Sequence, residues 1–292
     1  MKKVWITGAG GLLGNYLVQT ASTFAPDWKV FGLTRSQLDL TDDKSVREKF
    51  QRDQPDFIIH CAAQSKVPAC QSDPELAWKL NVDVTTALTK IAQNIPFIFF
   101  STDLVFDGLK GNYVETDATN PVTVYGETKV AAEKIVLQNP RHTVIRTSMN
   151  CGISPTGDRG FSDELFRSWK NGETTNLFLD EFRCPMFAAI TARAIWELAA
   201  KNVSGIFHLA GSERLSRADI GKLVASHFPE LNPKIKTGSV KDFHGPRRAP
   251  DTSVNCAKVQ KLLSFPLPAF SEWIGIHSAE LFREKNSRNS GG

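Results

Sequence analysis

The chain has 292 residues, of which 41% are hydrophobic, so it can form one large domain or two unequal ones around a sizeable core. Its formal charge of +4 comes from Lys and Arg residues spread along the sequence, without the basic stripe that nucleic-acid binding needs. No apolar run approaches the ~20 residues of a membrane helix, so we expect neither a nucleic-acid nor a membrane protein.

The cysteines and histidines show no metal-binding pattern. The five cysteines are odd in number and form no CxxC pair, and the six histidines have no ligand spacing with them. Glycines that follow the first strand closely interrupt any apolar segment of a signal peptide. We therefore expect reduced thiols, no metal site and a cytoplasmic protein.

The first half of the chain alternates short apolar runs with amphipathic stretches. In chain order the pattern predicts a strand at 4–7, a helix at 12–24, a strand at 29–33, a helix from 41 to about 51, a strand at 57–61, a long helix opened by 72–75, a strand at 97–101, a helix at 124–137 and a strand at 143–147. Continuous apolar strands between helices indicate an α/β fold with a doubly wound, Rossmann-like parallel sheet, which binds ligands beyond the carboxyl ends of its strands.

The pattern changes after about residue 150. It then predicts a helix at 161–170, a short strand at 176–179, a helix at 190–201, a strand at 206–209, a helix at 217–228 and a basic loop at 245–250. We therefore expect a dinucleotide-binding domain at 1–150, to which 187–212 returns. A smaller C-terminal substrate domain comprises 151–186 and 213–285, and the polar residues 286–292 are expected to be a disordered tail.

Three glycines follow the first strand and open the first helix. Gly8 permits a tight turn, Gly11 lets a pyrophosphate approach the backbone, and Gly14 lets the helix pack closely on the strand. The N–H groups of the helix N-terminus, where Leu12 and Leu13 lie, attract an anion. A glycine-rich segment alone is weak evidence, but the order of strand, turn and helix predicts a dinucleotide site.

The end of the second strand should select the cofactor. An NAD site usually offers an acid there, whereas this chain has Arg35, whose guanidinium can pair with a 2′-phosphate and favours NADP (NADPH). A solvent-facing arginine is the alternative. Asp39 and Leu40 could flank the adenine, or Asp39 is only a turn residue before Thr41.

Small side chains end the third strand. They would leave room for the cofactor ribose, although ordinary tight packing explains them equally well. These residues are Cys61, Ala62 and Ala63.

Tyr125 and Lys129 are four residues apart in a helical stretch and so share one face. A phenol with a pKa near 10 is a poor acid–base catalyst at neutral pH, and a nearby ammonium should lower that pKa. Thr102 ends the preceding strand and can hydrogen-bond a substrate carbonyl. The three residues predict carbonyl reduction, with hydride delivered to carbon and a proton from Tyr125 to oxygen.

These segments resemble the extended short-chain dehydrogenase/reductases. The resemblance rests on residues 7–14 and 125–129, and it sharpens at 101–108, 144–148 and 248–253, which are similar to the dTDP-4-dehydrorhamnose reductases. It spans roughly residues 3–275. It implies an NADPH-dependent reductase of a 4-keto nucleotide sugar and, because the family often dimerises, a possible homodimer.

The resemblance also implies roles for single residues. Thr102, Tyr125 and Lys129 become the catalytic residues, and Asn81 supports the active-site Lys through water. The substrate residues that it implies are Asp103 and Val105 near the sugar, Met149 in the sugar pocket, and Arg248, with Arg247, at a diphosphate. Met149 stands where the family often has Trp, which leaves the sugar open, and the two arginines could equally be solvated loop residues.

Two alternatives stay open at this point. An epimerase of the same superfamily would carry the same residues, whereas a dehydratase would need an acidic pair after Thr102, where only Asp103 stands. A non-catalytic regulatory subunit is the other alternative, because the β subunit of methionine adenosyltransferase resembles the same reductases. Net consumption of NADPH separates a reductase from both.

Overall fold

The main sheet is built from six parallel strands in residues 1–278, which are the residues that the computed structural model describes. The strands are β1 (Lys2–Thr7), β2 (Trp28–Leu33), β3 (Phe57–His60), β4 (Phe97–Thr102), β5 (His142–Thr147) and β10 (Gly205–Leu209). Their order is β10-β5-β4-β3-β1-β2, and every neighbouring pair is parallel. The predicted doubly wound α/β sheet is confirmed, and the predicted tail at 286–292 lies outside the described residues.

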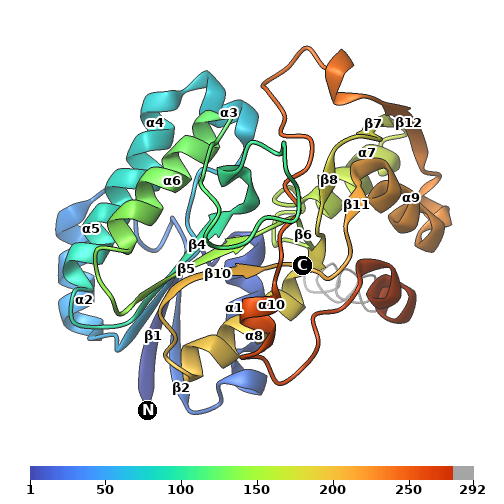
Figure 1. The fold of residues 1–292 in the computed structure, drawn as a ribbon. Helices are drawn as coiled ribbons and strands as arrows, with labels where there is room; N and C mark the ends of the chain where they lie inside the picture. The colour runs from blue at the N-terminus through green and yellow to red at the C-terminus, as the bar shows by residue number, and fades with distance from the viewer. Residues whose placement is uncertain (279–292) are drawn as a thin grey trace.

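Helices cover both faces of this sheet (Figure 1). Helices α1 (Leu12–Phe24) and α8 (Ala188–Ala200) lie on one face, and α2 (Asp43–Asp53), α5 (Val84–Ile91) and α6 (Val124–Val136) lie on the other. Successive strand residues point to opposite faces, so Val4 and Ile6 pack in one apolar cluster and Trp5 in the other. This two-sided burial explains the continuous apolar strands.

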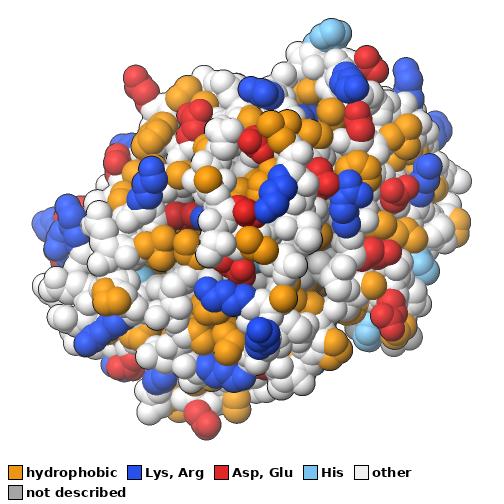
Figure 2. Space-filling view, viewed as in Figure 1, with side chains coloured by type: hydrophobic (Ala, Val, Ile, Leu, Met, Phe, Trp, Pro, Cys, Tyr) orange, Lys and Arg blue, Asp and Glu red, His pale blue; other side chains and the backbone are white. Residues whose placement is uncertain are grey.

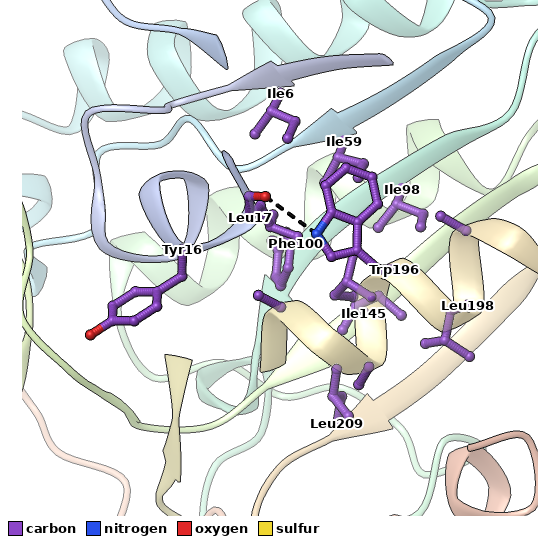
Figure 3. Packing of buried hydrophobic residues seen from close by; sticks show 14 of the residues in the cluster. Ile6, Tyr16, Leu17, Ile59, Ile98, Phe100, Ile145, Trp196, Leu198 and Leu209 are labelled. Atoms are coloured by element: carbon purple, nitrogen blue, oxygen red, sulfur yellow. Dashed lines mark hydrogen bonds between the residues drawn. The ribbon is translucent and has the colours of Figure 1, made fainter. Parts of the chain in front are cut away.

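The helices α1 and α8 also bond directly. Trp196 of α8 is buried, and its indole Nε1 donates a hydrogen bond of 3.2 Å to the carbonyl oxygen of Leu17 in α1 (Figure 3). A buried indole N–H needs such a partner. This hydrogen bond holds α8 against α1, the helix that follows the glycine turn.

The long helix predicted to open at 72–75 runs without a break from residue 74 to residue 91, through α4 (Pro74–Trp78), a π-helical turn (Lys79–Asp83) and α5. A separate short helix, α3 (Val67–Ser72), precedes it. Asp73 starts α4, because its carboxylate accepts the backbone N–H of Leu76 at 3.0 Å. The π-helical turn carries Asn81 and Val82 inward, and such turns are frequent at functional sites.

A second lobe follows β5 and has its own apolar cluster, which includes Phe161, Trp169 and Phe270. Its elements are β6 (Asn150–Cys151), α7 (Phe161–Lys170), β7 (Thr174–Phe178), β8 (Phe182–Arg183), β9 (Met186–Phe187), β11 (Leu215–Ser216), α9 (Arg217–His227), β12 (Lys234–Gly238) and short 3₁₀ turns at Pro229–Leu231 and Val240–Asp242. Helix α10 (Ala257–Gln260) follows this lobe and packs back against the main sheet. The strand predicted at 176–179 begins two residues earlier because β7 pairs along its length with β12, which the sequence pattern did not predict.

The chain reverses its winding direction between β1 and β3. β2 lies on one side of β1 and β3 on the other, so a crevice forms where the carboxyl ends of β1 and β3 meet. None of the described helices is long and apolar enough to cross a membrane. Lys and Arg side chains lie scattered among acidic and apolar ones on the face drawn in Figure 2.

Candidate functional site

The glycine turn lies in the crevice between β1 and β3. Gly8 has a φ of +71°, and a Cβ there would approach the backbone nitrogen of Ala62 to 2.7 Å. A Cβ on Gly14 would lie 2.3 Å from the carbonyl oxygen of Gly8. Both positions therefore require glycine, one for conformation and close approach to β3 and the other for packing of α1 on the turn.

The N-terminus of α1 has no side-chain cap. Its N-cap residue is Gly11, and the first turn holds no acid. The N–H groups of the first turn therefore have no carboxylate of the helix itself to satisfy them. The side chains of this turn are apolar, with Leu12 buried and Leu13 partly buried. An uncapped helix N-terminus beside a glycine turn is suited to an anionic phosphate group.

Arg35 follows β2 and is exposed. Asp39 is also exposed, and its Oδ1 accepts the backbone N–H of Thr41 at 2.9 Å and the Thr41 hydroxyl at 2.8 Å. These hydrogen bonds hold the pKa of Asp39 below its ordinary value. Asp39 therefore holds the turn before α2, and Leu40 is partly buried beside it. The place of both residues beside an adenine stays a prediction.

The chain after β3 is held by Asn81. The amide of Asn81 accepts from the backbone N–H of Gln64 at 2.8 Å and donates to its carbonyl at 3.1 Å and to Thr128 Oγ1 at 2.9 Å. The two hydrogen bonds to Gln64 fix the segment that lies along the crevice. This segment contains the partly buried Cys61 and Ala62 and the exposed Ala63. Asn81 therefore connects the segment 61–64 to α6 beside Lys129, through direct bonds.

Thr102 ends β4 and is buried against Asp103. Its hydroxyl donates to Asp103 Oδ1 at 3.2 Å and accepts the backbone N–H of Leu104 at 3.1 Å. The other Asp103 oxygen accepts hydroxyl hydrogens from Ser148 and Thr252, both at 2.8 Å. Asp103 therefore joins the end of β4 to the end of β5 and to the loop that precedes α10.

Helix α6 brings Tyr125 and Lys129 to this edge. Its N-cap Thr123 accepts the N–H of Gly126 at 3.1 Å, and a Cβ on Gly126 would lie 2.4 Å from the carbonyl oxygen of Leu104. The missing side chain lets α6 press against the turn that follows Thr102. Glycine at 126 is thus required by packing, which the YxxxK spacing alone does not reveal.

Burial governs the charges of both α6 residues. It lowers the pKa of Lys129 to about 7, opposed mainly by the Glu133 carboxylate. Burial, with added charge from Asp103, raises the pKa of Tyr125, and a Thr102 hydrogen bond opposes this rise. The expected lowering of the Tyr125 pKa by Lys129 is therefore not found, and desolvation of the phenol is the largest influence on it. A neutral phenol is the form that can donate a proton.

Two features in the surroundings of Lys129 have no counterpart among the sequence predictions. The Lys129 Nζ lies 3.9 Å from the centroid of the buried Phe99 ring, a cation–π contact from β4. Glu133, four residues after Lys129, forms a buried ion pair of 2.7 Å with Arg146 of β5. The signal for Glu133 was its spacing, because a helical residue at i+4 shares the face of Lys129.

Val105 and Met149 lie in different surroundings. Val105 is fully buried in an apolar cluster with Phe106 and Tyr113, so its side chain serves the core. Met149 is partly buried, packs against the second lobe's apolar cluster, and accepts the backbone N–H of Met186 at 2.9 Å. Met149 is therefore at the junction of the sheet and the second lobe.

Arg248 borders a cavity of about 520 Å³ in the second lobe. Its guanidinium lies 5.0 Å from the Phe178 ring and 4.8 Å from the Phe243 ring, and it pairs with Glu181 at 2.8 Å. Its Nε is buried with no hydrogen-bond partner among the described residues. Arg217 lines the same cavity, whereas the neighbouring Arg247 is exposed. The cavity combines cationic and aromatic side chains with the carboxylates of Glu164 and Asp242, and of these the sequence predicted only Arg248.

No metal centre is visible in the part of the chain that the structure describes, since no three His, Cys, Asp or Glu side chains gather there in a way that could hold an ion. The five cysteines are free.

Comparisons with known proteins identify the family and similar folds. Residues 1–281 match the family model described as RmlD substrate binding domain. The chain is 31% identical to dTDP-4-dehydrorhamnose reductase of Sinorhizobium fredii over 282 residues, which cover 91% of this chain and 93% of the relative. It is 27% identical to methionine adenosyltransferase 2 subunit beta of Xenopus laevis, over 89% of this chain and 82% of the relative.

The fold is similar to a crystal structure of dTDP-4-dehydrorhamnose reductase from Bacillus anthracis in complex with NADP. The TM-score is 0.85 with 24% identity, and the match covers 96% of this chain and 100% of the Bacillus anthracis chain.

Proposed function

The chain belongs to the RmlD substrate binding domain family, and from this premise we propose that it is an NADPH-dependent reductase of a nucleotide sugar. The proposed reaction reduces the 4-keto group of a dTDP-4-keto-6-deoxy sugar, as in dTDP-L-rhamnose formation. One observation carries the proposal. Thr102, at the end of β4, shares a hydrogen bond with Tyr125 of α6, and the glycine turn follows β1 at the same carboxyl edge of the parallel sheet.

The glycine turn fits a dinucleotide. The space that a Cβ would fill at Gly8 and Gly14 and the uncapped N-terminus of α1 favour a pyrophosphate there. Arg35, exposed after β2 where no acid stands, would bind a 2′-phosphate and so favour NADP. The Bacillus anthracis relative in complex with NADP supports this choice. When bound, NADPH would supply the hydride for the carbonyl carbon.

The chain's own groups would handle the proton. Thr102 would donate a hydrogen bond to the substrate carbonyl and polarise it. Tyr125, whose pKa is raised by burial, stays a neutral phenol and would give its proton to the carbonyl oxygen as negative charge develops there. Lys129, in its charged form, would stabilise the resulting phenolate. The buried Phe99 ring holds the Lys129 ammonium on the side of β4.

The cavity in the second lobe would take the nucleotide part of the substrate. Arg217 and Arg248 supply positive charge for a diphosphate, and the Phe161, Phe178 and Phe243 rings supply apolar faces for a base. Met149, at the junction between this lobe and the sheet, would lie between the cavity and Tyr125 and so border the sugar.

The test is loss of NADPH absorbance with dTDP-4-dehydro-6-deoxy-L-mannose generated in situ. We expect Tyr125→Phe to lower kcat by about 10²–10⁴-fold, the usual contribution of a proton donor, while the Kd for NADPH stays within about twofold. Undiminished turnover by Tyr125→Phe would show that another group is the acid.

The regulatory alternative is favoured by the similarity to the methionine adenosyltransferase subunits. It predicts NADPH binding without turnover, together with co-purification of a synthetase. An epimerase predicts conversion of a sugar nucleotide with no net loss of NADPH. Stoichiometric consumption of NADPH by the wild-type protein rejects both.

A further inference from the structure

Glu181 is a buried carboxylate shared by three arginines, and no sequence motif marks it. Its Oε1 accepts from Arg183 Nη2 at 2.9 Å and from Arg217 Nε at 3.0 Å, and its Oε2 accepts from Arg248 Nη1 at 2.8 Å. Only 1% of the residue is exposed. One carboxylate cannot neutralise three guanidinium groups, so the cluster keeps a net positive charge.

The three arginines have different surroundings. Arg217 and Arg248 line the cavity, whereas Arg183 does not and lies toward the end of β4. The Arg183 guanidinium is held by the carbonyl oxygen of Ala249, which both Nη atoms reach at 3.2 Å, and its Nε lies 3.7 Å from Asp103 Oδ2. Arg183 is therefore a fixed bridge between Glu181 and Asp103.

Asp103 competes with substrate for the Thr102 hydroxyl. A threonine hydroxyl has a single hydrogen, for which Asp103 Oδ1, at 3.2 Å, competes with the Tyr125 phenol oxygen. Arg183, with the Ser148 and Thr252 hydroxyls, gathers on the opposite oxygen, Oδ2. These three groups draw the negative charge of the Asp103 carboxylate toward Oδ2. The hydrogen bond that Oδ1 accepts from Thr102 is weaker as a result.

We propose that Arg183 is a positioning residue that keeps the Thr102 hydroxyl available to the substrate carbonyl, and that Glu181 anchors it to the arginines of the nucleotide cavity. This inference rests on the proposed function. Arg183 acts on turnover through Asp103 and Thr102. Glu181 acts on turnover through Arg183 and on substrate binding through Arg217 and Arg248.

The experiment compares kcat and KM for the dTDP-4-keto-6-deoxy sugar, with rates expressed per NADPH-binding site so that unfolded protein does not count. Arg183→Gln should lower kcat by ~10–100-fold, the loss expected for one charged interaction, while KM and the Kd for dTDP change less than about twofold. Arg183→Lys keeps the charge and should restore part of kcat. Glu181→Gln should lower kcat and also raise KM and the Kd for dTDP.

The matched control is Arg193→Gln, because Arg193 pairs with Glu197 at 3.6 Å on α8, away from the cluster. It should leave kcat and KM unchanged. If Arg183→Gln keeps the wild-type kcat, or raises KM and the Kd for dTDP as Glu181→Gln does, the positioning role is overturned while the reductase stands. If the wild-type protein does not consume NADPH with this substrate, the proposed function fails, and the inference that rests on it fails too.

Discussion

Lys129 illustrates how burial changes the chemistry of a single residue. Only 2% of it is exposed, its Nζ lies over the Phe99 ring, and burial lowers its pKa from an ordinary 10.5 to about 7. The spacing to Tyr125 predicted an ammonium beside the phenol, and burial in the folded chain brings the pKa of that ammonium close to neutrality.

This pKa makes stability depend on pH. At pH values below about 7 the ammonium is charged in both the folded and the unfolded chain, and its burial lowers the free energy of unfolding. Between about 7 and 10.5 the unfolded chain binds more protons than the folded one, so stability rises with pH. We expect Lys129→Met to raise the Tm of the cofactor-free protein in acid and to lose this gain as the pH approaches 10.5.

The measurement is the Tm of both proteins across this pH range. Lys134→Met is the control, since Lys134 lies on the same helix and is exposed. A gain that did not vary with pH would show that the buried charge is not the cause.

Arg35 offers a second prediction at the residue scale. Loss of one charge-assisted pair with a 2′-phosphate should weaken NADPH binding by ~10–100-fold and leave NADH binding within about twofold. The Kd values of Arg35→Ala for both cofactors test this, with Arg47→Ala on α2 as an exposed control. Equal losses for NADPH and NADH would reject the 2′-phosphate assignment.

At the scale of elements, the contact of α6 with the turn after β4 decides the site. Tyr125 and Thr102 come from different elements, and the absence of a side chain at Gly126 lets those elements touch. A Cβ at 126 would lie 2.4 Å from the Leu104 carbonyl oxygen, so Gly126→Ala must move α6. Displacement of a catalytic group by ~1 Å can cost about a hundredfold, and we expect a fall in kcat of that order.

The measurement is kcat of Gly126→Ala together with its Kd for NADPH, which should stay within about threefold if the glycine turn is intact. The control is Gly275→Ala, because Gly275 lies in a helical segment with nothing within 4 Å of an added Cβ. An unchanged kcat for Gly126→Ala would mean that α6 need not pack so closely on the turn.

At the scale of the whole molecule, a buried ion pair joins the sheet to its helical layer. Glu133 of α6 pairs with Arg146 of β5 at 2.7 Å, and Ser101 of β4 donates to the same carboxylate. Both side chains are 4% exposed. Removal of one partner leaves an uncompensated buried charge, so we expect Arg146→Met to lower the free energy of unfolding by ~3–5 kcal/mol.

Urea unfolding of the wild-type protein and of Arg146→Met measures this loss of free energy of unfolding. The double variant Glu133→Leu/Arg146→Met removes both charges and should recover most of the stability, because a well-packed apolar pair often replaces a buried ion pair without loss. A single variant as stable as wild type would show that water or a rearranged side chain satisfies Glu133.

The sequence by itself determined the sheet, the glycine turn and the α6 face that carries Tyr125 and Lys129. These features depend on local periodicity: continuous apolar runs for buried parallel strands, glycine where φ is positive or helices touch, and a spacing of four on a helix. Local patterns did not reveal the π-helical turn at Asn81 or the pairing of β7 with β12, because both depend on partners distant in the chain.

Tertiary structure alone decided how charges are shared. Glu181 and Arg183 are two residues apart, but their partners Arg217, Arg248 and Asp103 come from segments far along the sequence. Burial likewise set the pKa of Lys129, since desolvation depends on what surrounds the side chain and not on its neighbours in sequence. Periodicity specifies which elements form and which face they bury, whereas electrostatics in the interior acts through space and is determined only when the elements pack.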